Sequence, residues 1–129
     1  MTEIDVRTVS TAALAYFGDS VIELLVRRRL VGEGHSSSKS LNNHARAFVS
    51  APSQAAAMAK LLPHLSEEEA AVFRRGRNVG HTNTPKNATV AEYRSATGME
   101  ALFGYLYLTG RQDRAAALFE IAYQTKSAE

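Results

Sequence analysis

Two carboxylates stand out in this chain because each lies in a stretch that is otherwise apolar. Asp19 lies within residues 13–30, and Glu100 lies within residues 93–109. Both stretches repeat apolar residues at helical spacing around most of the circumference, which predicts two helices at the centre of the fold. We infer that the two carboxylates face each other, where they would repel and take up protons unless a cation compensates them. Because oxygen ligands suit Mg²⁺, the pair predicts a magnesium site with Asp19 and Glu100 as its ligands.

The residues beside these carboxylates add to the pattern. Asp19 follows Gly18, and a glycine inside a helix costs roughly 1 kcal/mol relative to alanine. A sequence selected only for folding would avoid a carboxylate beside such a glycine in a core helix. Thr97 and Gly104 share the helix face of Glu100. Small residues on that face would allow another helix to pack closely against it.

The two carboxylates also have a purely structural explanation, which the sequence leaves open: both could be core side chains that are satisfied by ion pairs with arginines. The arginines that could satisfy core carboxylates are Arg27, Arg28 and Arg94. Glu23, one turn after Asp19, can serve as an outer-shell group of the site or pair with Arg27 four residues on. Ser20 has no identifiable base, so a covalent serine mechanism is not expected.

A second candidate site is the polar segment of residues 74–87. It combines three arginines, a lysine, three asparagines and a histidine with two glycines and a proline. Arginine forks bind phosphates, and asparagine reaches phosphates, sugars or base edges. The alternative is a solvated helix end, because arginines also suit the negative end of a helix dipole. The residues expected to bind nucleic acid are Arg74, Arg75, Arg77, Asn78, Lys86 and Asn87.

The rest of the chain predicts an all-α fold of about six helices without strands or internal repeats. Pro63 is expected to end the third helix, and Ser66 with Glu69 forms a capping box that opens the fourth. The longest irregular segment is expected at residues 78–89. The expected helices cover residues 13–30, 39–49, 50–62, 66–77, 93–109 and 113–125.

Composition narrows the class of protein. The 129 residues predict one domain with a real core. The absence of cysteine excludes disulfides and thiolate metal sites, and four scattered histidines do not suggest a zinc site. No signal pattern or apolar run of about 20 residues is present, so a soluble cytoplasmic protein without a membrane partner is expected. The net charge is only +2, but residues 34–66 and 70–91 contain no acid, so the middle of the chain can face a polyanion.

Five segments, in this order, resemble the ribonuclease III family, three of them its compact branch called Mini-ribonuclease III. They are residues 14–27, 48–55, 74–78, 85–87 and 93–108, and the resemblance extends over about residues 9–118. It implies a homodimeric, all-α endoribonuclease that cuts double-stranded RNA with Mg²⁺, for which Mn²⁺ can substitute, and leaves 5′-phosphate ends. That branch is associated with maturation of both ends of the 23S ribosomal RNA precursor.

The resemblance also assigns residues. Asp19 stands at the signature aspartate and Glu100 at the glutamate of the second catalytic helix, and the helix around Asp19 would form the dimer. Ala15 and Thr97 stand where larger relatives have carboxylates. Only two metal-binding carboxylates then remain in the site, which favours one well-held Mg²⁺ over a two-metal arrangement. Thr97, like Glu23, is then a candidate for the outer shell of the metal site. Residues 1–129 are expected to form one catalytic domain without a separate RNA-binding domain. The basic segment of residues 74–87 would then make much of the contact with the RNA.

Two other functions remain open from the sequence. The missing carboxylates are compatible with a non-catalytic RNA-binding or ribosome-assembly dimer that keeps the fold. A metal-dependent hydrolase of small phosphate esters would use the same carboxylates, but the exposed basic segment argues against it.

Overall fold

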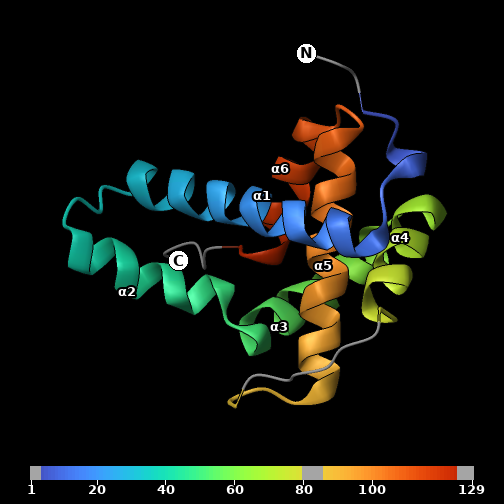
Figure 1. Cartoon of the computed structure of the whole chain (residues 1–129). Coiled ribbons are helices and arrows are strands. Elements are labelled where there is room, and N and C mark those ends of the chain that lie inside the picture. The colour runs from blue at the N-terminus through green and yellow to red at the C-terminus, as the bar shows by residue number, and fades with distance from the viewer. Residues whose placement is uncertain (1–3, 80–85, 125–129) are drawn as a thin grey trace.

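The computed structural model describes residues 4–79 and 86–124, and all regular structure in these ranges is helical (Figure 1). The prediction of an all-α fold with about six helices is confirmed. The six α-helices are α1 (Thr11–Gly32), α2 (Ser38–Val49), α3 (Ala51–Leu61), α4 (Glu67–Arg77), α5 (Val90–Leu108) and α6 (Gln112–Ala122). Two short 3-10 helices, η1 (Val6–Thr8) and η2 (Leu62–His64), complete the order. No helix in these ranges is long and apolar enough to cross a membrane.

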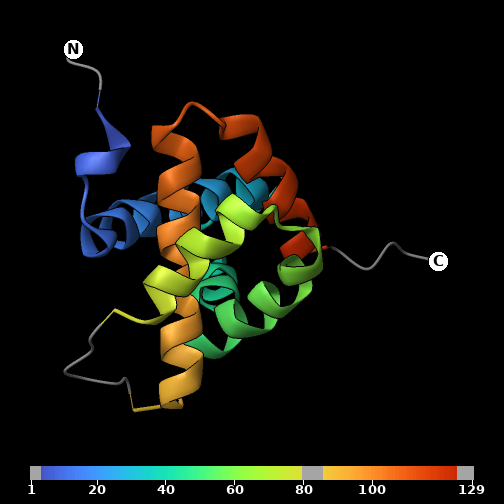
Figure 2. The ribbon, with the colours of Figure 1, turned by 90° about the vertical axis from the view of Figure 1, so that its right-hand side faces the viewer.

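Helix α5 is the centre of the fold. It contacts α1, α3, α4 and α6, and Figures 1 and 2 show it standing between α4 on one side and the α1–α2 pair on the other. Its side chains Leu102, Phe103 and Leu106 are fully buried, and they pack in one core with Ile22 and Val26 of α1. The two helices that the sequence placed at the centre are therefore in contact with each other.

The crossing of α1 and α5 depends on two glycines. A Cβ atom on Gly18 would lie 1.6 Å from the carbonyl oxygen of Glu100, and one on Gly104 would lie 2.2 Å from the carbonyl oxygen of Leu14. The two backbones therefore touch, which explains why α1 tolerates a glycine in its interior. The small residue predicted at Gly104 does allow this approach.

A second glycine crossing joins α4 to α5. A Cβ atom on Gly76 would lie 2.7 Å from the Cβ of Ala101, and one on Gly98 would lie 2.6 Å from the ring of Phe73. This contact fixes the C-terminal end of α4 against the middle of α5.

Hydroxyl side chains begin five of the helices. The capping residues, each accepting a backbone N–H three residues on, are Ser10, Ser37, Ser50, Ser66 and Thr89. The capping box predicted at Ser66 and Glu69 is confirmed. A second box, Thr89 with Glu92, starts α5 three residues earlier than predicted.

Three details of the sequence prediction were wrong. The last helix ends at Ala122 rather than near residue 125, which itself lies outside the described residues. The apolar spacing along the first two expected helices also predicts that Leu24 and Val49 face inward, but they are 53% and 39% exposed. The irregular segment is confirmed for residues 78, 79 and 86–89, and its residues 80–85 lie outside the described ranges.

A buried ion pair connects α4 to α6. Glu69 is 2% exposed, and Arg114 donates from Nε and Nη2 to its two carboxylate oxygens at 2.9 Å each. The same guanidinium donates to the carbonyl oxygen of His64 at 2.8 Å. Arg114 lowers the pKa of Glu69 from an ordinary value of 4.5 to about 2. The pair therefore stabilises the fold fully above about pH 4.5, and this stabilisation is lost as the pH falls toward 2.

Replacing Glu69 by glutamine should lower the free energy of unfolding at pH 7 by about 3 kcal/mol, because Arg114 loses its buried partner. The variant should also lose stability less steeply than the wild type between pH 4.5 and pH 2. Thermal unfolding measured across this range tests both effects. The control is Glu67→Gln, an exposed acid in the same turn, which should change stability by less than about 1 kcal/mol. An equal loss for both variants would contradict the assignment.

Candidate active site

The structure brings Asp19 and Glu100 together. Both line one open pocket of about 250 Å³ where α1 crosses α5. The glycine contact sets this geometry, because Gly18 packs on the backbone of Glu100 and Asp19 is the next residue. Asp19 is exposed and Glu100 is half-buried. The pair thus lies at the surface, not within the middle of the protein as the apolar stretches suggested.

The electrostatics of the pair are unfavourable without a cation. Burial of Glu100, and then the charge and hydrogen bonding of the neighbouring Asp19, raise the pKa of Glu100 to about 8. At pH 7 the pair therefore retains a proton on Glu100. Deprotonating it without a compensating charge places two negative charges in one partly enclosed pocket.

Arginines do not supply the compensating charge. Arg27 pairs with Glu23 instead, and Arg28 and Arg94 are exposed. Within residues 4–79 and 86–124, no salt bridge reaches Asp19 or Glu100. The explanation of the pair as carboxylates satisfied by core arginines is therefore wrong.

The donors present fit a hard divalent cation. The two carboxyl groups lie in an accessible pocket, and they share one proton at pH 7. Once a cation such as Mg²⁺ displaces this proton, both groups provide the oxygen ligands that such a cation prefers. Among the described residues, no three acidic or histidine side chains converge as a metal site. The other coordination positions of such an ion would fall to water or to substrate oxygens.

The two outer-shell candidates differ in position. Thr97 lines the pocket, and its hydroxyl donates to the carbonyl oxygen of Tyr93 at 3.0 Å. Glu23 is exposed, bound to Arg27 and outside the pocket lining. Thr97 therefore lines the pocket of the carboxylates, whereas Glu23 does not.

Three of the predicted cationic residues lie on α4, which ends two residues before Val79 of this pocket. Arg74, Arg75 and Arg77 are exposed on the last turns of α4. The guanidinium of Arg77 lies 5.7 Å from the centre of the Phe73 ring, and its Nε donates to Asn78 Oδ1 at 3.5 Å. Val79, which follows directly, lines the carboxylate pocket. The helix that carries these arginines therefore ends two residues before a residue that lines the pocket.

The other residues of the basic segment are only partly described. Lys86 and Asn87 are exposed just before α5 begins. Residues 80–85 between them and α4 lie outside the described ranges. The structure therefore shows that the described part of the segment is accessible, at both of its ends.

Tyr16 is a site residue that the sequence did not single out for a role. It lies one turn before Asp19, lines the pocket and is 86% exposed. Its position three residues from a candidate ligand on a helix was the available signal.

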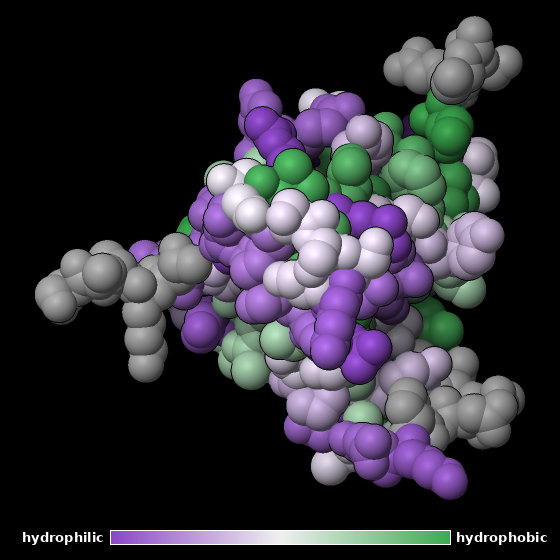
Figure 3. All heavy atoms as spheres, turned by 90° about the vertical axis from the view of Figure 1, so that its left-hand side faces the viewer, coloured by the Kyte–Doolittle hydropathy of each residue, from purple (hydrophilic) through white to green (hydrophobic). Residues whose placement is uncertain are grey.

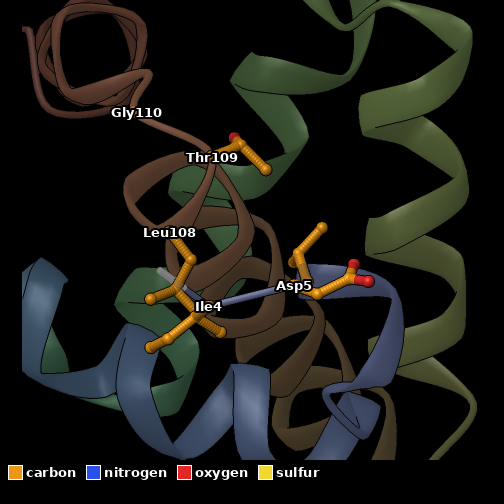
Figure 4. A pocket seen from close by; sticks show the side chains of 6 residues that line it. Ile4, Asp5, Leu108, Thr109 and Gly110 are labelled. Carbon is orange, nitrogen blue, oxygen red and sulfur yellow. The ribbon is translucent and has the colours of Figure 1, made fainter. Parts of the chain in front are cut away.

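Another, larger pocket lies elsewhere in the described residues, and its lining offers fewer groups for catalysis. It measures about 580 Å³ and lies where Ile4 and Asp5 approach the end of α5 at Leu108 and Thr109 (Figure 4). Its carboxylate, Asp5, accepts hydrogen bonds from the Arg7 backbone and guanidinium. The smaller carboxylate pocket is therefore the better candidate for the active site.

Comparison with known proteins identifies a protein family that this chain matches. The family model described as the ribonuclease III domain matches residues 12–111. The chain is 44% identical to Mini-ribonuclease 3 of Symbiobacterium thermophilum, covering 89% of this chain and 88% of the relative. It is 45% identical to Mini-ribonuclease 3 of Desulfitobacterium hafniense, covering 87% and 71%. A crystal structure of a Fusobacterium nucleatum protein matches with a TM-score of 0.82 at 31% identity, covering 91% of this chain and 93% of the other.

Proposed function

Because the chain belongs to the ribonuclease III domain family, in its compact Mini-ribonuclease III branch, we propose that it cleaves double-stranded RNA with Mg²⁺ held by Asp19 and Glu100. The observation that carries this proposal is the carboxylate pair, which has no salt bridge among the described residues and lies in an open pocket. Val79, two residues after the arginine-bearing helix α4, also lines this pocket. The natural substrate we propose is the 23S ribosomal RNA precursor in the cytoplasm. This substrate rests on the branch resemblance alone.

The chain's own residues would prepare the reaction. When bound, Mg²⁺ supplies polarisation of a phosphoryl oxygen and a water of lowered pKa. Asp19 offers an exposed carboxylate to the ion. Glu100 offers the second carboxylate once it releases the proton that its raised pKa retains. The open mouth of the pocket lets a phosphodiester within a duplex reach both groups.

The basic segment would hold the duplex. Arg74, Arg75, Arg77 and Lys86 present exposed cations that suit phosphates, and Asn78 and Asn87 suit sugar hydroxyls. An A-form duplex is recognised mainly through its shape, phosphates and 2′-hydroxyls. The enzyme is therefore expected to have only a weak sequence preference.

We also propose that the active form is a homodimer joined through α1. Tyr16, Leu24 and Val31 are 86%, 53% and 65% exposed. Their spacing puts them within about 80° on one face of the helix. Exposed apolar residues gathered on one face are typical of an interaction surface, and a second copy would bury them.

The test is cleavage of a long RNA duplex by the wild-type protein. We expect cutting with Mg²⁺, no cutting when a chelator is added, and little cutting of the matching single strand. Binding without cutting under every metal condition would instead favour a non-catalytic RNA-binding dimer. Turnover of mononucleotide esters without cutting of RNA would favour a small-substrate hydrolase, which the open pocket does not support.

A further inference from the structure

A second pocket, of about 350 Å³, lies where α2, α3 and the end of α6 meet. Arg29 of α1 also lines it, and this residue lies about 15 Å along the helix from Asp19. We call it the Arg29 pocket. Its volume lies within the range of about 300–1,000 Å³ that is typical of small-molecule sites. The small and aromatic side chains of its lining are Ala47, Phe48, Ala56, Ala57, Ala122 and Tyr123.

Arg29 brings a buried charge that the fold satisfies only in part. Its side chain is 8% exposed. One N–H group donates to the carbonyl oxygen of Tyr123, and another donates to Glu120 at 2.6 Å. A guanidinium carries five N–H donors, so three of them have no acceptor among residues 4–79 and 86–124. Because buried donors without acceptors are costly, an oxyanion in the pocket would stabilise this side chain.

Lys60 of α3 adds a second positive charge to the same pocket. It is exposed, and it forms no salt bridge with another described residue. Residues 34–66 contain no acid, and the described lining of the pocket contains none either. The acids near Arg29, which are Glu33 and Glu120, line a different pocket between α1 and α6. The charge of the Arg29 pocket therefore suits an anion.

Aromatic side chains form an apolar wall beside these cations. The ring centres of Phe48 and Tyr123 lie 5.0 Å apart, and the guanidinium carbon of Arg29 lies 5.9 Å from the centre of the Phe48 ring. The hydroxyl of Tyr123 donates to the carbonyl oxygen of Phe48 at 2.9 Å, which ties α6 to α2 at this wall. A ligand with its charged end at Arg29 would therefore lay its body against aromatic and alanine side chains.

We propose that the Arg29 pocket binds a small organic oxyanion, either a carboxylate or a phosphate monoester, with a compact aromatic body. Arg29 would donate to the oxyanion from the N–H groups that have no acceptor in the fold, and Lys60 would add the second charge. The aromatic body would pack against Phe48 and Tyr123. This site is separate from the carboxylate pocket, and the inference does not depend on the proposed function.

A macromolecular partner fits this pocket less well than a small ligand does. An RNA duplex is bound mainly through its shape and its phosphates, which meet exposed cations, whereas the Arg29 side chain is 8% exposed. The neighbouring end of the molecule, where α1 turns into α2, is mostly hydrophilic (Figure 3). The apolar wall is therefore a local feature and does not continue there as a large apolar patch of the kind that marks a protein interface.

The experiment is an amide NMR titration of the full chain with four probes. Phenyl phosphate and benzoate carry both the charge and the ring, inorganic phosphate carries only the charge, and benzyl alcohol carries only the ring. The better of the two complete probes should move the signals of the pocket residues at a concentration at least about 5-fold lower than either fragment needs. It also identifies which oxyanion the site prefers.

Variants at exposed positions locate the binding. Lys60→Ala should weaken binding of the complete probe by about 3- to 5-fold, the effect of one exposed ion pair. Ala56→Trp, at an exposed position of the pocket lining, should fill the pocket and abolish the shifts. Arg29 is kept, because its bond to Glu120 supports the fold. Lys39→Ala removes an exposed lysine of α2 outside the lining; it is the matched control and should bind like the wild type.

Three results would overturn the inference. If the complete probes move the pocket signals no more than inorganic phosphate does, the aromatic wall binds nothing. If Lys60→Ala and Ala56→Trp bind the complete probe like the wild type, the probe lies elsewhere. If an RNA duplex displaces the probe from the wild-type protein, the cations of the pocket belong to an RNA surface. None of these results measures RNA cleavage, so each would leave the proposed function standing.

Discussion

Replacing Asp19 by asparagine is expected to slow cleavage of an RNA duplex by at least about 1000-fold, which corresponds to about 4 kcal/mol of lost transition-state stabilisation. The amide keeps the size of the side chain but removes the negative charge that would hold Mg²⁺. Asp19 is exposed, so the variant should fold normally. The measurement is single-turnover cleavage at saturating protein, with duplex binding measured separately.

Two further variants test whether the loss of cleavage is specific to the carboxylate pair. Glu100→Gln should reduce cleavage by a similar factor, because it removes the other carboxylate. Asp113→Asn, at an exposed acid of α6, is the matched control and should keep wild-type activity. If Asp19→Asn still cleaves at more than about a tenth of the wild-type rate, Asp19 is not the metal ligand. Loss of duplex binding together with cleavage would point to a general disturbance instead.

The Gly18→Ala substitution is expected to destabilise the fold by about 3 kcal/mol or more. Helix propensity alone favours alanine over glycine by roughly 1 kcal/mol, so the expected effect has the opposite sign to the local preference. The reason is the helix crossing, where the added Cβ would lie 1.6 Å from the carbonyl oxygen of Glu100. Overpacking of this kind forces backbone shifts. Urea unfolding measures the loss.

The matched control for this prediction is Gly32→Ala at the end of the same helix. A Cβ atom there would meet nothing within 4 Å, so the change should be neutral or stabilising by up to about 1 kcal/mol. If Gly18→Ala is as stable as the wild type, then α1 and α5 do not touch at this crossing. Loss of cleavage by a destabilised variant that is still folded would show in addition that the crossing sets the spacing of Asp19 and Glu100.

Much of the fold could be predicted from local patterns in the sequence. The apolar periodicity around Asp19 and Glu100 predicted the two central helices, and Ser66 with Glu69 predicted the start of α4. These signals are local, because a cap or a helical face involves residues within one or two turns. The pairing of the two carboxylates followed from placing their helices in contact.

Contacts between distant residues could not be predicted. Glu69 was assigned only to a capping box, whereas its charge is also bound by Arg114, 45 positions later. Arg29 packs over the Phe119 ring at 5.0 Å and binds Glu120, and no local pattern indicated either contact. Such pairs depend on how helices cross, which periodicity does not specify.

The exposure of the site was also misjudged. Apolar residues around most of α1 suggested a helix enclosed within the fold, yet Tyr16 and Leu24 are exposed. Periodicity indicates which residues avoid water but not which molecule covers them. The proposed homodimer would cover this face with a second copy and leave the carboxylates open to the substrate.

The central claim is that Asp19 and Glu100 hold a divalent cation, and Mg²⁺ binding with its proton release tests it most directly. Calorimetry of the wild type in buffers of different ionisation enthalpy counts the protons released per ion. Because the pKa of Glu100 is raised to about 8, nearly one proton should leave at pH 7 and few at about pH 9.5, and apparent affinity should rise between these values. Asp19→Asn should abolish binding. Equal binding by that variant, or wild-type binding that releases no proton at pH 7, would contradict the claim.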